Sequence, residues 1–318
     1  MSLDPDIAVF LKLVGKGRAS GTSVPMHQLT PQQAREQFDQ SSLLMDAGGE
    51  HLEVVDELQL PVRDGSRLNA RIYSSQALHA DGSRPALLYF HGGGYVVGSL
   101  ESHDSLCRTL AVLADCVVLS VAYRLAPEFR FPTAADDAQD AWDWLVASAP
   151  TLGLDASRLA VAGDSVGASL ATVLAAQLES ASVRPRLQVL IYPVTDASRS
   201  TASIERFGEG YLLEKDSLSW FYQHYQREAS DRLDPRFSPL LAEVPANLPP
   251  AVLVLAEYDP LHDEGVAYAR HLQAAGVDVR LKVYAGMTHD FIRMGAIVDA
   301  ADDAQRYIAE QLVEVFSR

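Results

Sequence analysis

A short apolar run, residues 158–163, leads directly into the pentapeptide GDSVG (163–167), and a second apolar run continues to about residue 179. The first run has the length of a buried strand and the second the length of a helix. The pentapeptide fits the pattern G-x-S-x-G, whose glycines let a strand turn sharply into a helix and expose a serine above the sheet. A chain with this feature is expected to contain parallel strand–helix units.

The same alternation of strand and helix runs through most of the chain. Strand patterns lie at residues 51–61, 67–74, 85–90, 117–123, 158–163, 187–193, 251–257 and 279–285. Helical patterns lie at residues 104–114, 134–148, 166–179 and 263–275, and a final one starts near residue 297. Apolar strands that alternate with helices form parallel sheets covered on both faces, so we expect an α/β fold with a mostly parallel eight-stranded sheet. The first two strands, joined by an Asp64-Gly65 turn, are expected to be antiparallel and to lie at one edge.

Two stretches do not fit this alternation. Residues 1–50 contain two helical patterns separated by a Gly15–Pro25 loop, and residues 196–247 contain two more before a proline-rich loop. We expect these two stretches to pack together as a helical cap. Residues 51–195 and 248–318 are then the two parts of one catalytic α/β domain.

Charge and composition argue against several classes of partner. Of the 318 residues, 42 are acidic and 26 basic, which gives a formal net charge of −16. A strongly acidic surface repels nucleic acids and anionic lipid headgroups, so neither is an expected partner. No signal peptide and no apolar run near the ~20 residues of a membrane span is visible, which predicts a cytoplasmic protein without membrane association. Cys107 and Cys116 lack a metal-binding spacing, so no metal site is expected.

A glycine-rich loop follows the third strand pattern, where His91 precedes Gly92, Gly93 and Gly94. Without side chains in the way, the backbone N–H groups of such a loop can point into a pocket, which is the geometry that an oxyanion hole needs. Acyl transfer requires both a nucleophile and oxyanion donors, so this loop and Ser165 support each other.

A serine hydroxyl is a weak nucleophile and needs a base that a third group orients. With this pentapeptide the chain order is serine, acid, histidine, which leaves His224, His262, His271 and His289 among the nine histidines. His224 lies in the expected cap, and His262 and His271 lie at or within a helical pattern. His289 follows the last strand pattern, at the sheet edge where open α/β sheets bind ligands, and is the predicted base.

The orienting acid is expected between the nucleophile and the base, at the carboxyl end of a strand. Asp259 has that position and is the predicted acid. Three alternatives remain: Glu257, which ends the same strand pattern; Asp263, where a helix N-cap is expected; and Asp196, after the preceding strand.

Five segments together resemble the hormone-sensitive-lipase family of bacterial carboxylesterases, often called family IV. They are HGGGYVVGSLESHD, YRLAPE, GDSVGAS, EYDPLHDEG and MTHDF, and they occur in the family's order from about residue 52 to the C-terminus. The resemblance implies the α/β-hydrolase fold with a two-part helical cap, a small-molecule ester as substrate, and no metal or organic cofactor. Members of the family often dimerise through the edge of the sheet, which makes a homodimer one expected assembly.

The resemblance also implies roles for particular residues. They are a catalytic triad of Ser165, Asp259 and His289, oxyanion donors at the amides of Gly93, Gly94 and Val166, and supporting motif residues His91, Gly92 and Asp164. The segment YRLAPE, with Glu128, is interpreted as structural.

The sequence departs from the family pattern beside two of these residues. Asp290 follows the predicted base where the family usually has glycine, and Val166 stands where alanine is usual. A carboxylate next to an imidazole favours its charged form, so we expect Asp290 to raise the pKa of His289. A branched side chain at Val166 is expected to narrow the pocket.

The predicted function is hydrolysis of short- to medium-chain carboxylic esters through an acyl-enzyme, because a helical cap implies an apolar pocket of limited depth. Two alternatives remain. The same triad also suits an amide or peptide hydrolase. The second alternative is a non-catalytic small-molecule receptor. Plant gibberellin receptors share this fold but have lost the triad histidine. The presence of His289 argues against this alternative.

Overall fold

The strands form a single sheet of eight members in the order β1-β2-β4-β3-β5-β6-β7-β8 in the computed structural model, which describes residues 2–80 and 82–318. The strands are β1 Val54–Pro61, β2 Arg67–Ser74, β3 Arg84–Phe90, β4 Val117–Ala122, β5 Leu154–Asp164, β6 Gln188–Ile191, β7 Ala251–Tyr258 and β8 Val279–Thr288. β1 and β2 pair antiparallel, and β2 pairs antiparallel with β4. All other pairs are parallel. The predicted mostly parallel sheet with an antiparallel edge is confirmed.

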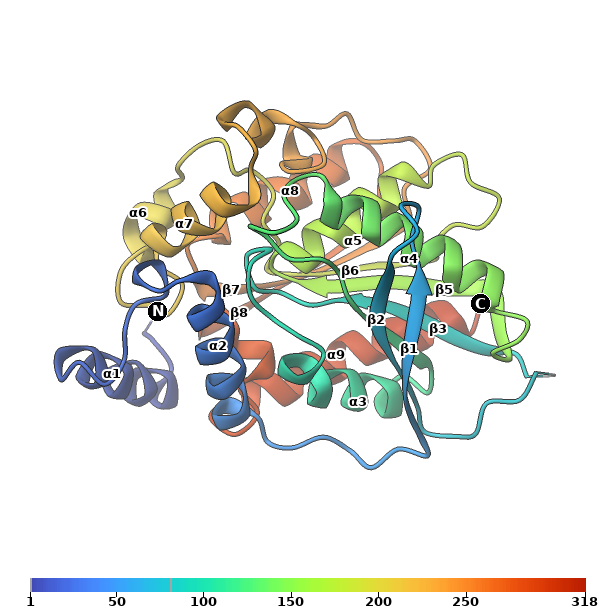
Figure 1. Cartoon of the computed structure of the whole chain (residues 1–318), viewed down its shortest axis with the longest axis horizontal. Helices are drawn as coiled ribbons and strands as arrows, with labels where there is room; N and C mark the ends of the chain where they lie inside the picture. The colour runs from blue at the N-terminus through green and yellow to red at the C-terminus, as the bar shows by residue number, and fades with distance from the viewer. Residues whose placement is uncertain (1, 81) are drawn as a thin grey trace.

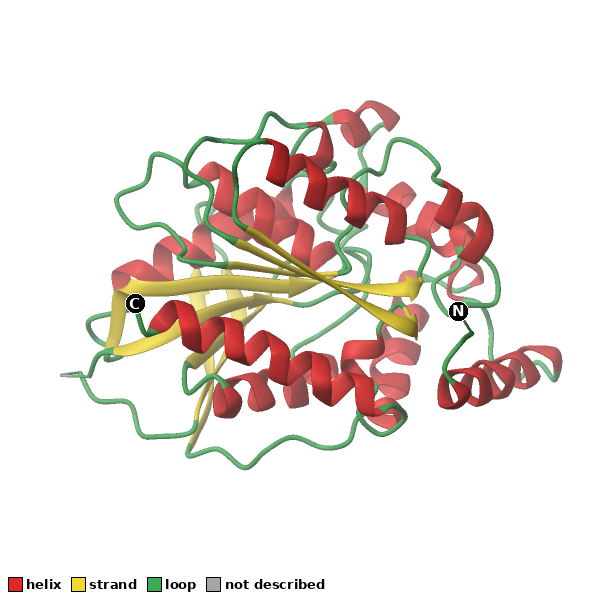
Figure 2. Cartoon of the chain, turned by 180° about the vertical axis from the view of Figure 1, so that it is seen from behind, coloured by secondary structure: helices red, strands yellow, loops and turns green. Residues whose placement is uncertain are grey.

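Nine helices are present in the described residues, and five of them cover the two faces of this sheet. They are α1 Pro5–Ala19, α2 Pro31–Met45, α3 Asp104–Leu113, α4 Thr133–Ser148, α5 Val166–Gln177, α6 Ala202–Phe207, α7 Lys215–Tyr225, α8 His262–Ala274 and α9 Asp299–Phe316. Short 3₁₀ turns lie at η1 Met26–Gln28, η2 Glu101–His103, η3 Ala229–Leu233, η4 Pro239–Leu241 and η5 Phe291–Arg293. Helices α3 and α9 lie on one face, and α4, α5 and α8 lie on the other (Figures 1 and 2).

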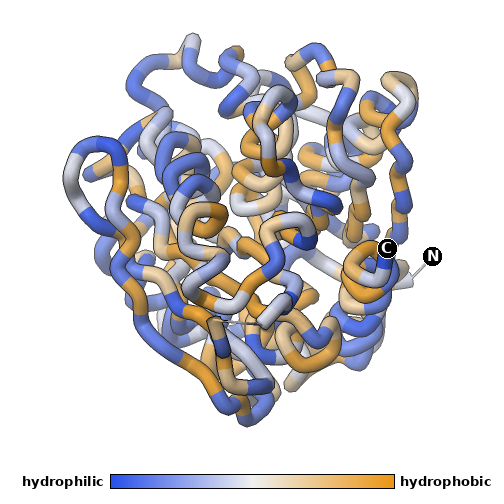
Figure 3. The backbone as a smooth tube through the Cα atoms, turned by 90° about the vertical axis from the view of Figure 1, so that its right-hand side faces the viewer, coloured by the Kyte–Doolittle hydropathy of each residue, from blue (hydrophilic) through white to orange (hydrophobic). Residues whose placement is uncertain are grey.

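The core is divided by the sheet into two apolar clusters, because successive side chains of a strand point to opposite faces. In β3, Leu88 and Phe90 belong to one cluster, and Leu87 and Tyr89 belong to the other. Hydrophobic stretches run through the interior while several outer loops are hydrophilic (Figure 3). An apolar strand is thus buried on both sides, as the unbroken apolar patterns predict.

Some boundaries differ from the predicted ones. α1 continues through Gly15 to Ala19, so the expected loop is shorter; a helical glycine costs only about 1 kcal/mol relative to alanine, and α1 tolerates it. β5 begins earlier, at Leu154, and β6 is only four residues long. β8 runs on to Thr288, which brings the residue after it directly to the end of a strand.

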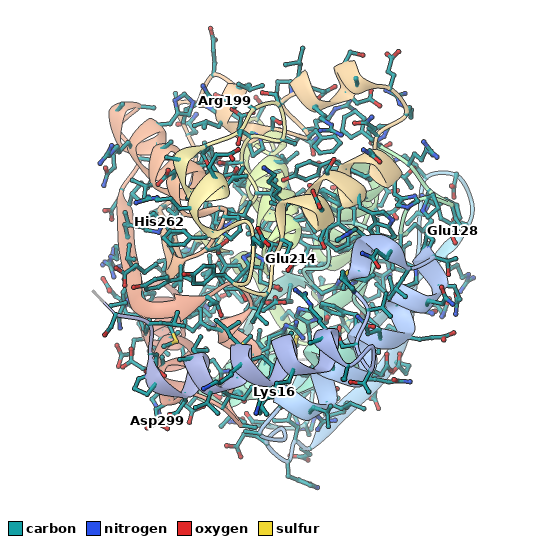
Figure 4. The ribbon with its side chains drawn as sticks, turned by 90° about the vertical axis from the view of Figure 1, so that its left-hand side faces the viewer. Lys16, Glu128, Arg199, Glu214, His262 and Asp299 are labelled. Carbon is teal, nitrogen blue, oxygen red and sulfur yellow. The ribbon has the colours of Figure 1, made fainter. Side chains whose placement is uncertain are left out.

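The helical segments 2–50 and 196–247 gather at the carboxyl end of the parallel strands (Figure 1). Arg18 of α1 forms an ion pair with Glu214, at the start of α7. Viewed from the left-hand side of Figure 1, Glu214 lies between α1, which carries Lys16, and the helices α6 and α7 (Figure 4). Across residues 2–80 and 82–318, no helix combines the length and apolar character of a bilayer span.

Candidate active site

Ser165 lies at the turn between β5 and α5 with a left-handed backbone, φ 54° and ψ −123°. Its amide donates to the carbonyl of Ile191 at the end of β6, 2.8 Å away. The turn is tight enough to exclude side chains at both flanking glycines. A Cβ at Gly163 would lie 2.4 Å from the Gly167 backbone, and a Cβ at Gly167 would lie 2.0 Å from the Phe90 carbonyl. The strained turn therefore depends on this glycine pattern.

Three side chains from separate strand ends form one hydrogen-bonded chain. His289 Nδ1 lies 2.7 Å from Asp259 Oδ2, and His289 Nε2 lies 3.1 Å from Ser165 Oγ. A carboxylate only accepts, so Nδ1–H donates to Asp259 and leaves Nε2 free to accept the serine proton. The structure thus brings together the three residues that the sequence singles out, after β5, β7 and β8.

The environment of His289 favours its charged form. Burial opposes the charge, but the hydrogen-bonded Asp259 carboxylate outweighs it, with further contributions from Asp290 and Asp164, so the pKa of His289 is raised. Asp290 has a left-handed backbone at φ 69°, a conformation that favours glycine. The direction agrees with the effect expected of Asp290.

The alternative acids are engaged elsewhere. Glu257 does belong to β7 and accepts from the Gly286 amide at 2.9 Å. Asp263 lies in the first turn of α8, one position inside the helix start, and accepts from the Ser203 amide at 2.8 Å. Asp196 accepts from Ser198 and pairs with Arg199.

The alternative histidines also have other partners. His262 Nδ1–H donates to the Ala256 carbonyl and His271 Nε2–H to the Ala242 carbonyl, each at 2.8 Å. His224 packs edge-on against Trp220 in α7. Each of these contacts lies outside the hydrogen-bonded chain around Ser165.

The glycine loop after β3 bends back beside Ser165. Gly93 and Gly94 have φ values of 117° and 61°, and a Cβ at Gly94 would lie 2.2 Å from the Phe221 ring of α7. Among the hydrogen bonds of the described residues, none between backbone groups uses the amide of Gly93 or Gly94. The Val166 amide is the first of α5, where helix amides have no partner within the helix. The Val166 side chain packs into the core cluster.

The carboxylate of Asp164 holds this loop in place. Two of its partners, Tyr89 and His103, were not identified from the sequence. Its Oδ1 accepts from the Gly92 amide at 3.0 Å and from the Tyr89 hydroxyl at 2.7 Å, and His103 Nε2 lies 3.3 Å from Oδ2. Burial alone would raise its pKa, but His103, the Arg293 guanidinium and Tyr89 together hold the pKa of Asp164 well below its usual range. Asp164 is therefore an ionised anchor for the loop.

His91 is fixed as a neutral side chain. Burial, reinforced by the neighbouring His103, lowers the pKa of His91 to about 3. Its Nδ1–H donates to the Gly92 carbonyl at 2.7 Å, and its ring stacks on Tyr123 with centroids 4.4 Å apart. The motif histidine thus braces the glycine loop without reaching Ser165.

A cavity of about 570 Å³ opens above Ser165 and His289. Its lining includes Phe10, Val14 and Phe38 from the N-terminal helices, and Leu212, Leu213 and Phe221 from the segment 196–247. Within residues 2–80 and 82–318, no three histidine, cysteine or carboxylate side chains are grouped to hold a metal ion. The site can therefore hold an apolar group next to the Ser165 hydroxyl, the His289 imidazole and the backbone of Gly93 and Gly94.

Comparison with known proteins gives relatives along the whole chain. Residues 87–293 match a family described by its alpha/beta hydrolase fold. The ethyl acetate hydrolase of Pseudomonas putida is 55% identical over 314 residues, which cover 98% of this chain and 99% of that protein. The carboxylic ester hydrolase LipN of Mycobacterium tuberculosis is 42% identical over 77% of this chain and 65% of its own length.

A solved structure is similarly close. The ester-hydrolase EH1AB1 from the metagenome of Lake Arreo superposes with a TM-score of 0.94 and 37% identity, over 99% of this chain and 100% of that one. Its crystals contain a derivative of bipyridine phosphonate.

Proposed function

The chain belongs to the hormone-sensitive-lipase family of α/β-hydrolase carboxylesterases and is a serine carboxylic ester hydrolase, and on that premise we propose that Ser165, His289 and Asp259 are its catalytic triad. The observation that carries the proposal is the continuous contact from Asp259 Oδ2 through His289 to Ser165 Oγ. In this proposal Ser165 is the nucleophile, His289 the general base and Asp259 the group that orients it.

The first half of the reaction acylates the enzyme. Ser165 Oγ attacks the ester carbonyl carbon while its proton passes to His289 Nε2, and a tetrahedral oxyanion forms. The amides of Gly93, Gly94 and Val166 donate to that oxyanion, each worth roughly 3–4 kcal/mol in the transition state. When the tetrahedral species collapses, the C–O bond to the leaving group breaks, and the imidazolium of His289 gives its proton to the departing alcohol.

The second half releases the acid. Water loses a proton to His289 as it attacks the acyl carbon, and the same amides hold the second oxyanion. Collapse breaks the bond to Ser165 Oγ, which recovers its proton from His289. The hydrogen bond to Asp259 keeps a proton on His289 Nδ1. Nε2 is therefore the nitrogen that accepts and returns the proton in every step.

We propose esters of short to medium acyl chains as substrates. A cavity of about 570 Å³ whose lining includes the apolar side chains of Phe10, Phe38 and Phe221 suits a small ester. The relative that is 55% identical is named for ethyl acetate, the ester of a two-carbon acid, which favours the short end of this range.

We further propose that residues 2–50 and 196–247 act as one cap on a catalytic domain formed by residues 51–195 and 248–318. Both segments contribute residues to the lining of the cavity, and the ion pair Arg18–Glu214 joins them. The cap would then limit the size of the substrate, and the catalytic domain would supply the residues that carry out the reaction.

The test is hydrolysis of p-nitrophenyl esters from acetate to palmitate by the wild type and by Ser165→Ala. We expect a rate maximum at short or medium chains and its loss in the variant. Faster turnover of palmitate than of butyrate would refute the chain-length proposal, and an active variant would refute the nucleophile. An ester and its isosteric anilide, assayed side by side, separate ester from amide hydrolysis.

A further inference from the structure

Arg293 is a buried arginine directly behind the proposed base. It ends the 3₁₀ turn η5 that begins two residues after His289, and its side chain is only 4% exposed. A guanidinium cannot lose its charge in a protein, so its burial requires nearby compensation. The sequence motifs do not single out this residue, and the mechanism above does not use it.

Arg293 contacts three separate parts of the site. Its Nη2 lies 3.3 Å from Oδ2 of Asp290, the residue after the proposed base. Its Nη1 donates to Ser42 Oγ of α2 at 2.8 Å and to the Ser102 carbonyl at 3.2 Å. The guanidinium also stacks on the Phe38 ring of α2, 4.8 Å from its centroid.

The contact at Ser102 leads to the oxyanion loop. Ser102 Oγ lies 2.8 Å from His103 Nδ1, and His103 Nε2 approaches the Asp164 carboxylate. Asp164 in turn holds the Gly92 amide at 3.0 Å. One guanidinium is therefore linked to the base loop, the oxyanion loop and the cap helix α2.

We propose that Arg293 is a positioning residue that holds these three parts in register and offsets the charge of Asp290 beside His289. The inference rests on the proposed role of His289 as general base. It accounts for the negative charge that Asp290 places next to the base, because the buried guanidinium of Arg293 lies 3.3 Å from that carboxylate.

Other titratable or charged groups surround this pair. They are His289, Asp259, Asp164, His103, His91 and Tyr192 within the site, and Asp46, Glu50, Asp302 and Arg306 along the cavity of about 250 Å³ behind Arg293. None of these groups is itself altered by a substitution at Asp290 or Arg293. A cycle of variants at these two positions therefore isolates their effect on His289.

The test is the acidic limb of the pH profile of kcat/KM, measured on a short p-nitrophenyl ester. Asp290→Asn removes a negative charge and is expected to move the limb to lower pH by roughly 0.5–1 unit. Arg293→Met removes a positive charge and should move it to higher pH by a similar amount. The double variant should return near the wild-type limb. A limb that Arg293→Met leaves in place, or moves in the same direction as Asp290→Asn, would overturn the charge-offsetting role.

Two further variants separate position from charge and guard against misfolding of Arg293→Met. Arg293→Lys keeps the charge but not the planar group that reaches Asp290, Ser42 and Ser102 together, so we expect a several-fold lower kcat with an unmoved limb. An unchanged kcat would overturn the positioning role. Ser42→Ala removes the hydrogen bond between Arg293 and α2 without changing any charge. The acidic limb of this variant should match that of the wild type. A limb moved by Ser42→Ala would show that a loosened helix, rather than charge, is responsible, and would also overturn the inference.

Ser165→Ala, assayed beside these variants, distinguishes the two proposals. Loss of activity in that variant together with unmoved limbs in the charge variants would refute only the role of Arg293. Retained activity would refute the triad itself.

Discussion

The guanidinium of Arg35 on α2 makes two parallel hydrogen bonds to the carboxylate of Glu128, with Nη1–Oε1 at 3.0 Å and Nη2–Oε2 at 2.6 Å. The same guanidinium donates to the carbonyls of Val96 at 2.9 Å and Ala126 at 2.8 Å. Glu128 belongs to the segment YRLAPE. The contacts of Arg35 therefore fix α2 to the loop that contains Glu128, which agrees with the structural interpretation of that segment.

Glu128→Gln is expected to leave kcat within about twofold of the wild type and to cost at most about 1 kcal/mol of stability, because the Glu128 side chain is 54% exposed. Steady-state kinetics and urea unfolding measure the two effects. A loss of kcat comparable to that of Ser165→Ala would instead give Glu128 a part in the chemistry.

Asp259→Asn is expected to lower kcat by about 10³- to 10⁴-fold, since an amide at this position no longer selects the tautomer in which Nε2 accepts the serine proton. Asp196→Asn is the matched control, because Asp196 is also buried and also follows a strand. It should keep kcat within about tenfold. The reverse order of the two effects would reassign the orienting acid.

Asp290→Gly is expected to shift the acidic limb of the pH–rate profile downward. His289 must be neutral to accept a proton, and Asp290 is among the groups that raise the pKa of His289. Removing this carboxylate lowers that pKa, so activity should persist to lower pH. The left-handed backbone suits glycine, so the fold should tolerate the change. An unmoved limb in the purified, folded variant would refute the idea.

Arg124→Met is expected to destabilise the protein by about 3–5 kcal/mol, because it leaves the buried carboxylate of Asp137 without its cation. Arg124 donates to Asp137 through Nη2 at 2.6 Å and Nε at 3.0 Å, and Asp137 is fully buried. Burial raises the pKa of Asp137 despite this pairing. Protonation neutralises the stranded carboxylate, so the loss should be smaller at pH 5 than at pH 8.

Urea unfolding of Arg124→Met at both pH values measures this effect. The double variant with Asp137→Asn is the control and should recover part of the lost stability. Equal destabilisation at both pH values would mean that lost packing, rather than an unpaired charge, dominates.

Much of the fold was predictable because it rests on local patterns. Unbroken apolar runs such as β3 are buried on both sides, and their period and spacing are visible in the chain. The positions of Ser165 and His289 were also predictable, because each follows a strand pattern and the two occur in the chain order serine, acid, histidine. Strand ends were less accurate: β8 extends to Thr288 through a register shift near Tyr258 that no periodicity indicates.

The partners of the supporting residues were not predictable, since they are distant in the chain. Tyr89 and His103 meet at Asp164 only when β3, η2 and β5 are assembled. Arg293 resembles an ordinary basic residue until the fold places Ser42, 251 positions earlier, beside it. Such long-range polar contacts leave no short motif, so sequence reasoning assigned them no role.

The strand β6 supplies none of the three proposed reacting side chains, yet it lies between β5 and β7, which lead to Ser165 and Asp259. Adjacent strands are about 4.8 Å apart, so one intervening strand separates the other two by roughly 9.5 Å. An imidazole with hydrogen bonds of 2.7 and 3.1 Å on its two nitrogens fits that gap. This short strand therefore sets the distance between the strands that lead to Ser165 and Asp259, and its Ile191 carbonyl holds the Ser165 amide, so that His289 can contact both side chains at once.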